Sequence, residues 1–313
     1  MDELRVIAAS RGVFLRREAR DLGFDDASVT AAVRAGVWTR VRRGAYTFTD
    51  LWREADEPAR HLIRARAVLR SLGPAVALSH VSAAVAHGVA TFDLDLSRVH
   101  VTRLDRGAGR TEPDVVHHEG SCLDGDVVER DGLRLMRPDR AVLEAASLAP
   151  LESGLVSVDS ALHQRLVTRE QLDARVRAME RWPFTRRLHL VVGLADGRSE
   201  SVGESRGRFL IWKHGLPAPE LQFRVWDASG QLIGVTDYAW PAHRLLGEFD
   251  GKAKYGRLLA PGQEPGDAVF AEKRREDRLR EVTGWAMLRI TWPDLNAGTH
   301  TAARVRRLMS SAA

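Results

Sequence analysis

The chain has 313 residues, a formal net charge of +5, 44% hydrophobic residues and 28% charged residues, which is ordinary for a folded protein of two or three domains. Cys122 is its only cysteine, so the composition excludes an internal disulfide and a cysteine-based zinc site. No run reaches the roughly 20 apolar residues needed to cross a bilayer, and residues 1–3 do not begin a signal peptide. We therefore expect a cytoplasmic protein with no membrane partner, and the basic excess is compatible with a polyanionic one.

Three short helical patterns open the chain, over residues 2–10, 15–22 and 26–35. Asp25 or Asp26 can cap the third helix, and Gly36 lies where a left-handed residue commonly ends one. Only a few residues separate the second and third patterns. They therefore predict a helix-turn-helix, in which the last helix enters the major groove of DNA.

Residues 37–46 alternate apolar and basic side chains and turn at Gly44, which is typical of the β-hairpin wing of a winged helix. Hydroxyls and arginines of this region are the candidate DNA contacts. We expect Ser28, Thr30 and Arg34 to face base edges, and Arg40, Arg42 and Arg43 to contact phosphates. The alternative is a small three-helix bundle with a solvated hairpin, used for protein contacts.

Residues 12–16 (GVFLR) and 36–46 (GVWTRVRRGAY) resemble the winged-helix N-terminal domain of AbiEi-family antitoxins. The resemblance implies that residues 1–50 form a winged helix-turn-helix domain that binds double-stranded DNA. It also implies a protein that represses its own promoter and neutralises a nucleotidyltransferase-like toxin.

Residues 51–198 mix helical and strand patterns. One helical pattern contains His80 and His87, but no carboxylate lies at metal-ligand spacing from them, so we interpret both as core or capping residues and not as a zinc site. The resemblance to AbiEi-like proteins continues in the order of three short motifs, at residues 78–84, 98–102 and 137–142. We expect this middle region to be a scaffold or to bind a partner.

Residues 234–255 carry two strand-forming runs around a Pro-Ala-His breaker, which predicts a β-hairpin. A two-residue turn would set Asp237 opposite Leu246, whereas a four-residue loop would set it opposite Glu248. In either register Asp237, Glu248 and Asp250 share one face, because side chains alternate along a strand. Such carboxylates suit a hard divalent cation, Mg²⁺ or Mn²⁺; the alternative is a solvated acidic face.

The segment 204–295, with Asp237 and the sequence EFDG at residues 248–251, resembles a Vsr-like (very-short-patch-repair-type) domain of the PD-(D/E)XK nuclease superfamily. Periodicity independently predicts the order helix, three strands, helix and strand here. The resemblance implies that residues 199–313 form a restriction-endonuclease-like α/β core.

The same resemblance implies a catalytic site made of Glu204, Asp237, Glu248 and Asp250, with Asp237 and Glu248 as metal ligands. Asp250 stands where many members of the superfamily have a catalytic lysine, and Lys252 is the candidate substitute. Glu204 has a second interpretation, because Ser201 and Glu204 have the spacing of a helix capping box.

These patterns predict an α+β multidomain protein, with an N-terminal winged helix, a mixed α/β middle region and a C-terminal nuclease-like core. The expected function is docking on DNA followed by Mg²⁺-dependent hydrolysis of its phosphodiesters. One alternative is an AbiEi-like type IV antitoxin and autorepressor whose nuclease fold is inactive. Another is a structural module that binds no nucleic acid.

Overall fold

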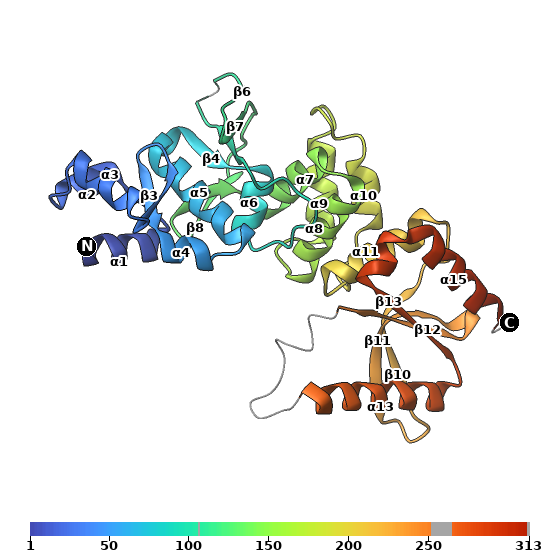
Figure 1. Ribbon diagram of the computed structural model, residues 1–313. Helices are drawn as coiled ribbons and strands as arrows, with labels where there is room; N and C mark the ends of the chain where they lie inside the picture. Colours follow the sequence, from blue (N-terminus) through green and yellow to red (C-terminus); the bar gives the residue numbers. More distant parts are fainter. Residues whose placement is uncertain (106, 252–264, 312–313) are drawn as a thin grey trace. The chain divides into compact units, whose positions relative to one another are not determined.

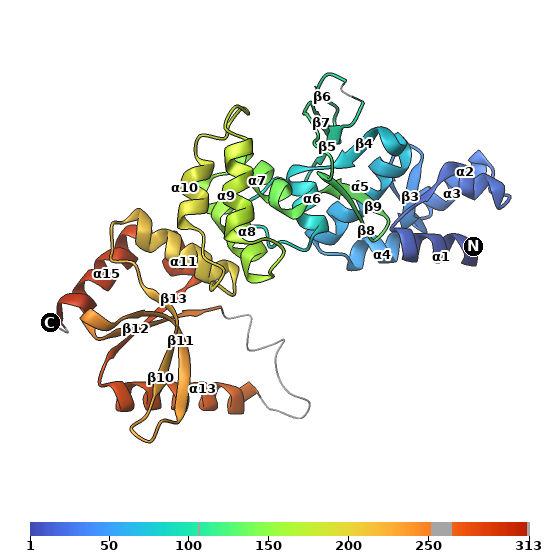
Figure 2. The ribbon, with the colours of Figure 1, turned by 180° about the vertical axis from the view of Figure 1, so that it is seen from behind.

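The protein is described by a computed structural model over residues 1–105, 107–251 and 265–311, and it divides into two compact units (Figure 1 and Figure 2). The first comprises residues 1–161 and 165–194, and the second residues 162–164 and 195–313. The described residues form helices and three β-sheets, of three, six and four strands, which confirms the predicted α+β class. Among the described helices, none combines the length and the apolar character that crossing a bilayer requires.

The first unit begins with the elements of a winged helix. They are α1 (Asp2–Arg11), β1 (Phe14–Leu15), α2 (Arg16–Asp21), α3 (Asp26–Arg34), β2 (Trp38–Arg42) and β3 (Ala45–Phe48). The strands form an antiparallel sheet in the order β1-β3-β2. Asp25 caps α3 by accepting a hydrogen bond from the Ser28 amide at 2.8 Å, and Gly36 follows α3 with a φ of 70°. The predicted three helices and hairpin are therefore present.

An aromatic core holds α3 in place. The Trp38 ring on β2 meets the Phe14 ring edge-on, with centroids 4.9 Å apart, and the Phe48 ring lies near both, 6.3 Å from Trp38 and 6.0 Å from Phe14. Leu4 of α1 and Val29 of α3 belong to the same buried cluster. Burial of each such side chain contributes about 1.5–3 kcal/mol, so the Val29 side of α3 is packed and its opposite side is left exposed.

The middle of the chain, which belongs to the same unit, is a six-stranded sheet with helices. Its strands are β4 (Val76–Leu78), β5 (Val99–Arg103), β6 (Arg110–Thr111), β7 (Val115–His118), β8 (Val127–Arg130) and β9 (Leu133–Met136), in the order β6-β7-β5-β4-β9-β8. The β8–β9 hairpin turns at Asp131-Gly132, where both residues have a positive φ. The helices are α4 (Thr49–Glu54), α5 (Glu57–Leu72), α6 (His80–Ala86), α7 (Pro138–Leu148), α8 (Leu151–His163), α9 (Arg169–Ala178) and α10 (Leu188–Leu194).

The second unit is a four-stranded sheet in the order β10-β11-β12-β13, covered by helices. Its elements are α11 (Val202–Lys213), β10 (Glu220–Trp226), β11 (Leu232–Trp240), β12 (Leu245–Asp250), α13 (Pro265–Thr283), β13 (Ala286–Thr291), α14 (Trp292–Asn296) and α15 (Gly298–Ser311). The strands β12 and β13 run parallel, with α13 between them in the chain. The predicted order of helix, three strands, helix and strand is observed, and the sequence pattern did not predict the two helices after β13.

The two faces of this sheet carry different layers. Tyr238 and Phe249 pack with Leu210 of α11 and Val305 of α15, whereas alternate positions on the same strands pack against α13 through Leu279. Figure 1 shows α13 on one side of the four strands, with α11 and α15 on the other. A residue's place in the alternation therefore decides which helices it faces.

Candidate functional site

The predicted base-reading side chains of the winged helix are exposed. Ser28, Thr30 and Arg34 are all exposed residues of α3, with Thr30 and Arg34 one turn apart. The Ser28 hydroxyl donates to Oδ1 of Asp25 at 2.6 Å, and the Thr30 hydroxyl donates to the Asp26 carbonyl at 2.8 Å. Both hydroxyl oxygens keep acceptor capacity, and no partner for the Arg34 guanidinium is found among the described residues, so this surface can meet the edges of bases.

The three predicted phosphate contacts on the hairpin differ. Arg40 and Arg43 are exposed. Arg42 is not: its side chain is 15% exposed and forms ion pairs with Glu112 at 3.3 Å and Asp114 at 2.9 Å. Arg42 could contact a phosphate only if both of its ion pairs broke. Arg40 and Arg43 are exposed without any such change.

The overall charge of this region favours a polyanion. Residues 1–49 contain nine arginines and six acidic residues. One of the exposed arginines, Arg16, forms an ion pair with Asp26, but Arg17 and Arg20 on α2 are also exposed. A positive excess of this kind favours a polyanionic partner.

The second predicted site is the β11–β12 hairpin, and its loop has four residues. Trp240 pairs with Leu245 across residues 241–244, which is the register that sets Asp237 opposite Glu248. Consistent with this register, Oδ2 of Asp237 accepts a hydrogen bond from the Phe249 amide at 2.7 Å. The alternation along β12 also places Asp250 on the face that α13 covers, so the three predicted carboxylates share a face.

Arginines provide positive charge on this face. Arg275 of α13 donates to Oε1 of Glu248 at 2.6 Å, and Glu248 is only 8% exposed. Arg289 of β13 lies 3.4 Å from Asp250 and also pairs with Glu276 of α13. The repulsion expected among clustered carboxylates is therefore reduced by guanidinium groups, and a cation at Glu248 would have to displace Arg275.

Glu204 acts as a helix cap. Its carboxylate accepts hydrogen bonds from the Glu200 amide at 2.9 Å, the Ser201 hydroxyl at 2.7 Å and the Gln222 side chain at 3.2 Å, while its own amide donates to Ser201 at 3.2 Å. The capping interpretation of Glu204 is thus the one that its contacts support. Lys252, the predicted substitute for a catalytic lysine, lies outside the described residues.

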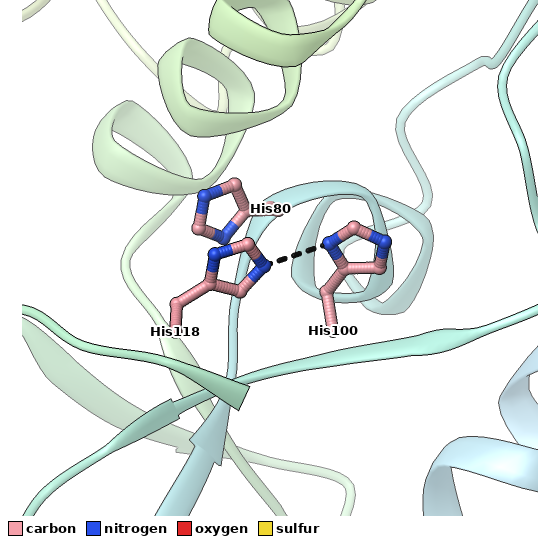
Figure 3. A group of neighbouring side chains, drawn as sticks. All are labelled: His80, His100 and His118. Atoms are coloured by element: carbon pink, nitrogen blue, oxygen red, sulfur yellow. Dashed lines mark hydrogen bonds between the residues drawn. The ribbon is translucent and has the colours of Figure 1, made fainter. Parts of the chain in front are cut away.

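Three histidines form a cluster that the sequence pattern did not predict. In the described ranges, the one group of three or more potential metal-ligand residues with atoms close enough to share an ion is His80, His100 and His118. Figure 3 shows the three imidazoles converging from α6, β5 and β7. The acidic residues Asp237, Glu248, Asp250 and Glu204 form no such group in those ranges.

The sequence pattern indicates a core or capping role for His80 and His87 alike and does not connect His80 with His100 and His118. The nearby His87 donates from Nε2 to the Met136 carbonyl, 2.8 Å away, and lies apart from the cluster, as a core histidine. The available signal was the alternation within the strands, which puts His100 and His118 on one side of the sheet, but pairing them requires the strand order.

Comparison with known proteins identifies the N-terminal region. Two Mycobacterium tuberculosis proteins, uncharacterized protein MT2308 and uncharacterized protein Rv2248, are each 28% identical to the chain over 195 residues, which is 59% of this chain and 68% of theirs. The crystal structure of RV2827C protein from Mycobacterium tuberculosis is similar with a TM-score of 0.39 and 16% identity, over 71% of this chain and 87% of that one. A family model described as "Transcriptional regulator, AbiEi antitoxin" matches residues 1–49. The chain therefore carries an AbiEi antitoxin-type transcriptional-regulator domain at residues 1–49.

Proposed function

We propose that the chain is a DNA-binding regulator of the AbiEi-antitoxin type that docks through its winged helix. The observation that carries this proposal is the exposure of Ser28, Thr30 and Arg34 on α3, in a domain that matches a regulator family. With α3 in the major groove, Arg34 is suited to a guanine edge and the two hydroxyls to either purine or pyrimidine edges. Arg40 and Arg43 on the hairpin then contact the flanking backbone.

The two groups of contacts have different signatures in a binding experiment. Removing a phosphate contact lowers affinity for all sequences and reduces the slope of log K against log salt by about 0.9. Removing a base contact costs about 1–3 kcal/mol on the cognate site and relaxes the preference at one base pair.

The test is fluorescence anisotropy with DNA from the chain's own promoter, at several salt concentrations. Arg34→Ala should weaken the cognate site by about 10-fold or more and leave random DNA nearly unchanged. Arg40→Ala and Arg43→Ala should weaken both DNAs and reduce the salt slope. Arg177→Ala, which removes an exposed arginine from α9, is the matched control. Loss of affinity in the control equal to that of Arg34→Ala, or binding without salt dependence, would refute the docking proposal.

We also propose an antitoxin role, in which the protein partner is a nucleotidyltransferase-like toxin. The antitoxin role is supported by the family match alone. Co-expression of this chain with such a toxin from the same locus should restore growth, and a chain lacking residues 1–49 should lose promoter binding while its effect on growth is measured separately. Absence of rescue by the full chain would remove the antitoxin role and leave the DNA-binding role standing.

A second candidate function is a Mg²⁺-dependent nuclease in the second unit. The adjacent Asp237 and Glu248, and the order of elements from α11 to β13, favour it. Asp237 and Glu248 would hold the ion, with Asp250 beside them, and the ion would supply a bound water for attack on a phosphodiester. Two contacts argue against this function. The Glu204 carboxylate caps α11, and Arg275 is hydrogen-bonded to the Glu248 carboxylate that the ion would need.

The nuclease candidate is tested by incubating plasmid and linear DNA with the full chain and Mg²⁺ or Mn²⁺. If it is correct, cleavage occurs and is abolished by Asp237→Asn with Glu248→Gln, while Arg280→Ala, an exposed change on α13, leaves it intact. Isothermal titration with Mn²⁺ gives a second readout, because the paired substitution should remove binding. If neither cleavage nor Mn²⁺ binding at these residues is found, the second unit is not a nuclease.

A further inference from the structure

The histidine cluster is assembled by the topology of the six-stranded sheet. His80 begins α6 directly after β4, His100 lies on β5, and His118 ends β7. Strand β5 pairs with both β4 and β7, and its parallel register with β7 matches Thr102 to His118, two residues from His100. As a result, one potential ligand nitrogen from each imidazole lies within 4.8 Å of the others.

The three rings are in direct contact. Nδ1 of His100 and Nε2 of His118 are 2.9 Å apart and share a hydrogen bond, and the His80 and His118 rings stack with centroids 3.6 Å apart. Figure 3 shows this hydrogen bond as a dashed line. Because a hydrogen bond between two neutral imidazoles uses one N–H and one lone pair, a change of tautomer at one ring turns both nitrogens into lone-pair donors.

Burial keeps these imidazoles neutral. It lowers the pKa of His100 to about 3 and that of His118 to about 4, with a smaller contribution from neighbouring histidines. The pKa of His80 is also well below its ordinary value, chiefly because of burial and then because of His118, His100 and Arg140. Burial is therefore the main cause of the lowered pKa in all three imidazoles.

Side chains around His80 orient its ring. Its Nδ1 lies 3.0 Å from the Ser79 hydroxyl and 3.6 Å from Oε2 of Glu144, and its amide donates to the same Glu144 oxygen at 3.2 Å. A hydroxyl or carboxylate on one ring nitrogen is the arrangement that fixes the tautomer of metal-binding histidines. These contacts hold the His80 ring beside His118, where one of its nitrogens lies within 4.8 Å of nitrogens of the other two rings.

The cluster opens into a cavity of about 390 Å³. His80 and His118 line it, together with Arg140, Glu144 and Trp182. A cavity beside three imidazoles offers an entry path and an open coordination position, which distinguishes reactive or ligand-binding zinc sites from closed structural ones.

We propose that His80, His100 and His118 bind one divalent transition-metal ion of the Zn²⁺ class, with a fourth position open to this cavity. Zn–N bonds of about 2.0–2.1 Å in a tetrahedron require nitrogens about 3.4 Å apart, so the present spacings of 2.9 Å for one pair and 4.8 Å or less overall need a shift of about 1 Å. Imidazole ligands favour zinc, copper, nickel and iron over Mg²⁺ and Ca²⁺. The site is separate from the DNA-docking surface and does not depend on it.

The test uses the full chain without an affinity tag, stripped with a chelator and then titrated with Co²⁺ and Zn²⁺. A bound Co²⁺ ion with three nitrogens should give a visible absorption band that saturates at one ion per chain and disappears on addition of Zn²⁺. His100→Gln and His118→Gln should each weaken binding by more than about 100-fold. His189→Gln, at a 62% exposed side chain on α10, is the matched control and should bind as the unmodified chain does.

Two measurements keep the outcome clear if a variant folds poorly. Circular dichroism of the metal-free variants establishes whether they fold, and X-ray absorption of the Zn²⁺-loaded unmodified chain counts its imidazole ligands without any substitution. The proposal would be overturned if Co²⁺ binding did not saturate, or if X-ray absorption showed fewer than three imidazole ligands on the zinc. It would also be overturned if His189→Gln weakened binding as much as His100→Gln or His118→Gln does.

Discussion

Replacing Arg140 by methionine should destabilise the first unit strongly. The Arg140 side chain is 1% exposed, and it donates to Glu144 and Asp126 at 2.7 Å each, while its guanidinium lies 4.7 Å from the Trp182 ring centre. Breaking a buried ion pair costs about 3–5 kcal/mol, because the remaining charge stays buried without its partner. Asp126 keeps Arg175 at 2.7 Å, so we expect about 3 kcal/mol, which arises mainly at Glu144.

A second substitution separates charge from packing. Arg140→Met with Glu144→Leu removes both charges, and a well-packed apolar replacement of a buried pair is often neutral. The double variant should therefore be more stable than Arg140→Met alone, by about 1–3 kcal/mol. Urea unfolding gives the free energies, and amide hydrogen exchange in α7 assigns the loss to this region.

The reasoning would be refuted by either of two results. One is a loss of less than about 1 kcal/mol for Arg140→Met, which would mean that Glu144 finds water or another partner at little cost. The other is a double variant less stable than the single one, which would show that Glu144 contributes through contacts other than this ion pair.

Gly203→Ala on α11 would place a methyl carbon 1.9 Å from the Phe249 ring and should lower the free energy of unfolding by about 1–3 kcal/mol. In Gly193→Ala on α10 the new methyl carbon has no atom within 4 Å, so this change should raise it by up to about 1 kcal/mol. Equal effects of the two substitutions in urea unfolding would contradict the packing. In the folded protein the pKa of His118 is about 4, below its ordinary value of 6.5. Between these two pH values the imidazole is therefore protonated in the unfolded chain and neutral in the folded one. Stability should fall by up to about 1.4 kcal/mol per unit as pH is lowered through that window, and His118→Gln should flatten the decline in thermal melts. Arg42→Met should cost no more than about 1 kcal/mol and leave the salt slope of DNA binding unchanged; a slope smaller by about 0.9 would place Arg42 on a phosphate after all.

Local signals made the winged helix predictable. Its helix ends depend on residues that act within one or two turns, such as the Asp25 cap and the positive φ of 70° at Gly36, and the hairpin turns at Gly44 with a φ of 76°. The order of elements in the second unit was predictable for the same reason. Each strand is a short apolar run bounded by its own turn residues.

Features that depend on distant partners were not predictable. The four-residue loop of the β11–β12 hairpin requires Arg244 to adopt a φ of 44°, a conformation that local sequence rarely indicates for arginine. Arg275 reaches Glu248 from a helix 27 residues further along the chain, so the carboxylates could be placed on one face without knowing what neutralises them. The histidine cluster depends on a strand order that no local pattern encodes.

The ion pairs of Arg42 with Glu112 and Asp114 have a consequence for how an operator would be read. They join the turn end of the β2–β3 hairpin to residues 112–114, between β6 and β7, and so couple the domain that carries α3 to the six-stranded sheet. In a dimer built through that sheet, the distance between the two recognition helices would be set by the protein. For both copies to bind at once, the operator would then need half-sites about 34 Å apart, which is one turn of DNA, or a whole number of turns apart.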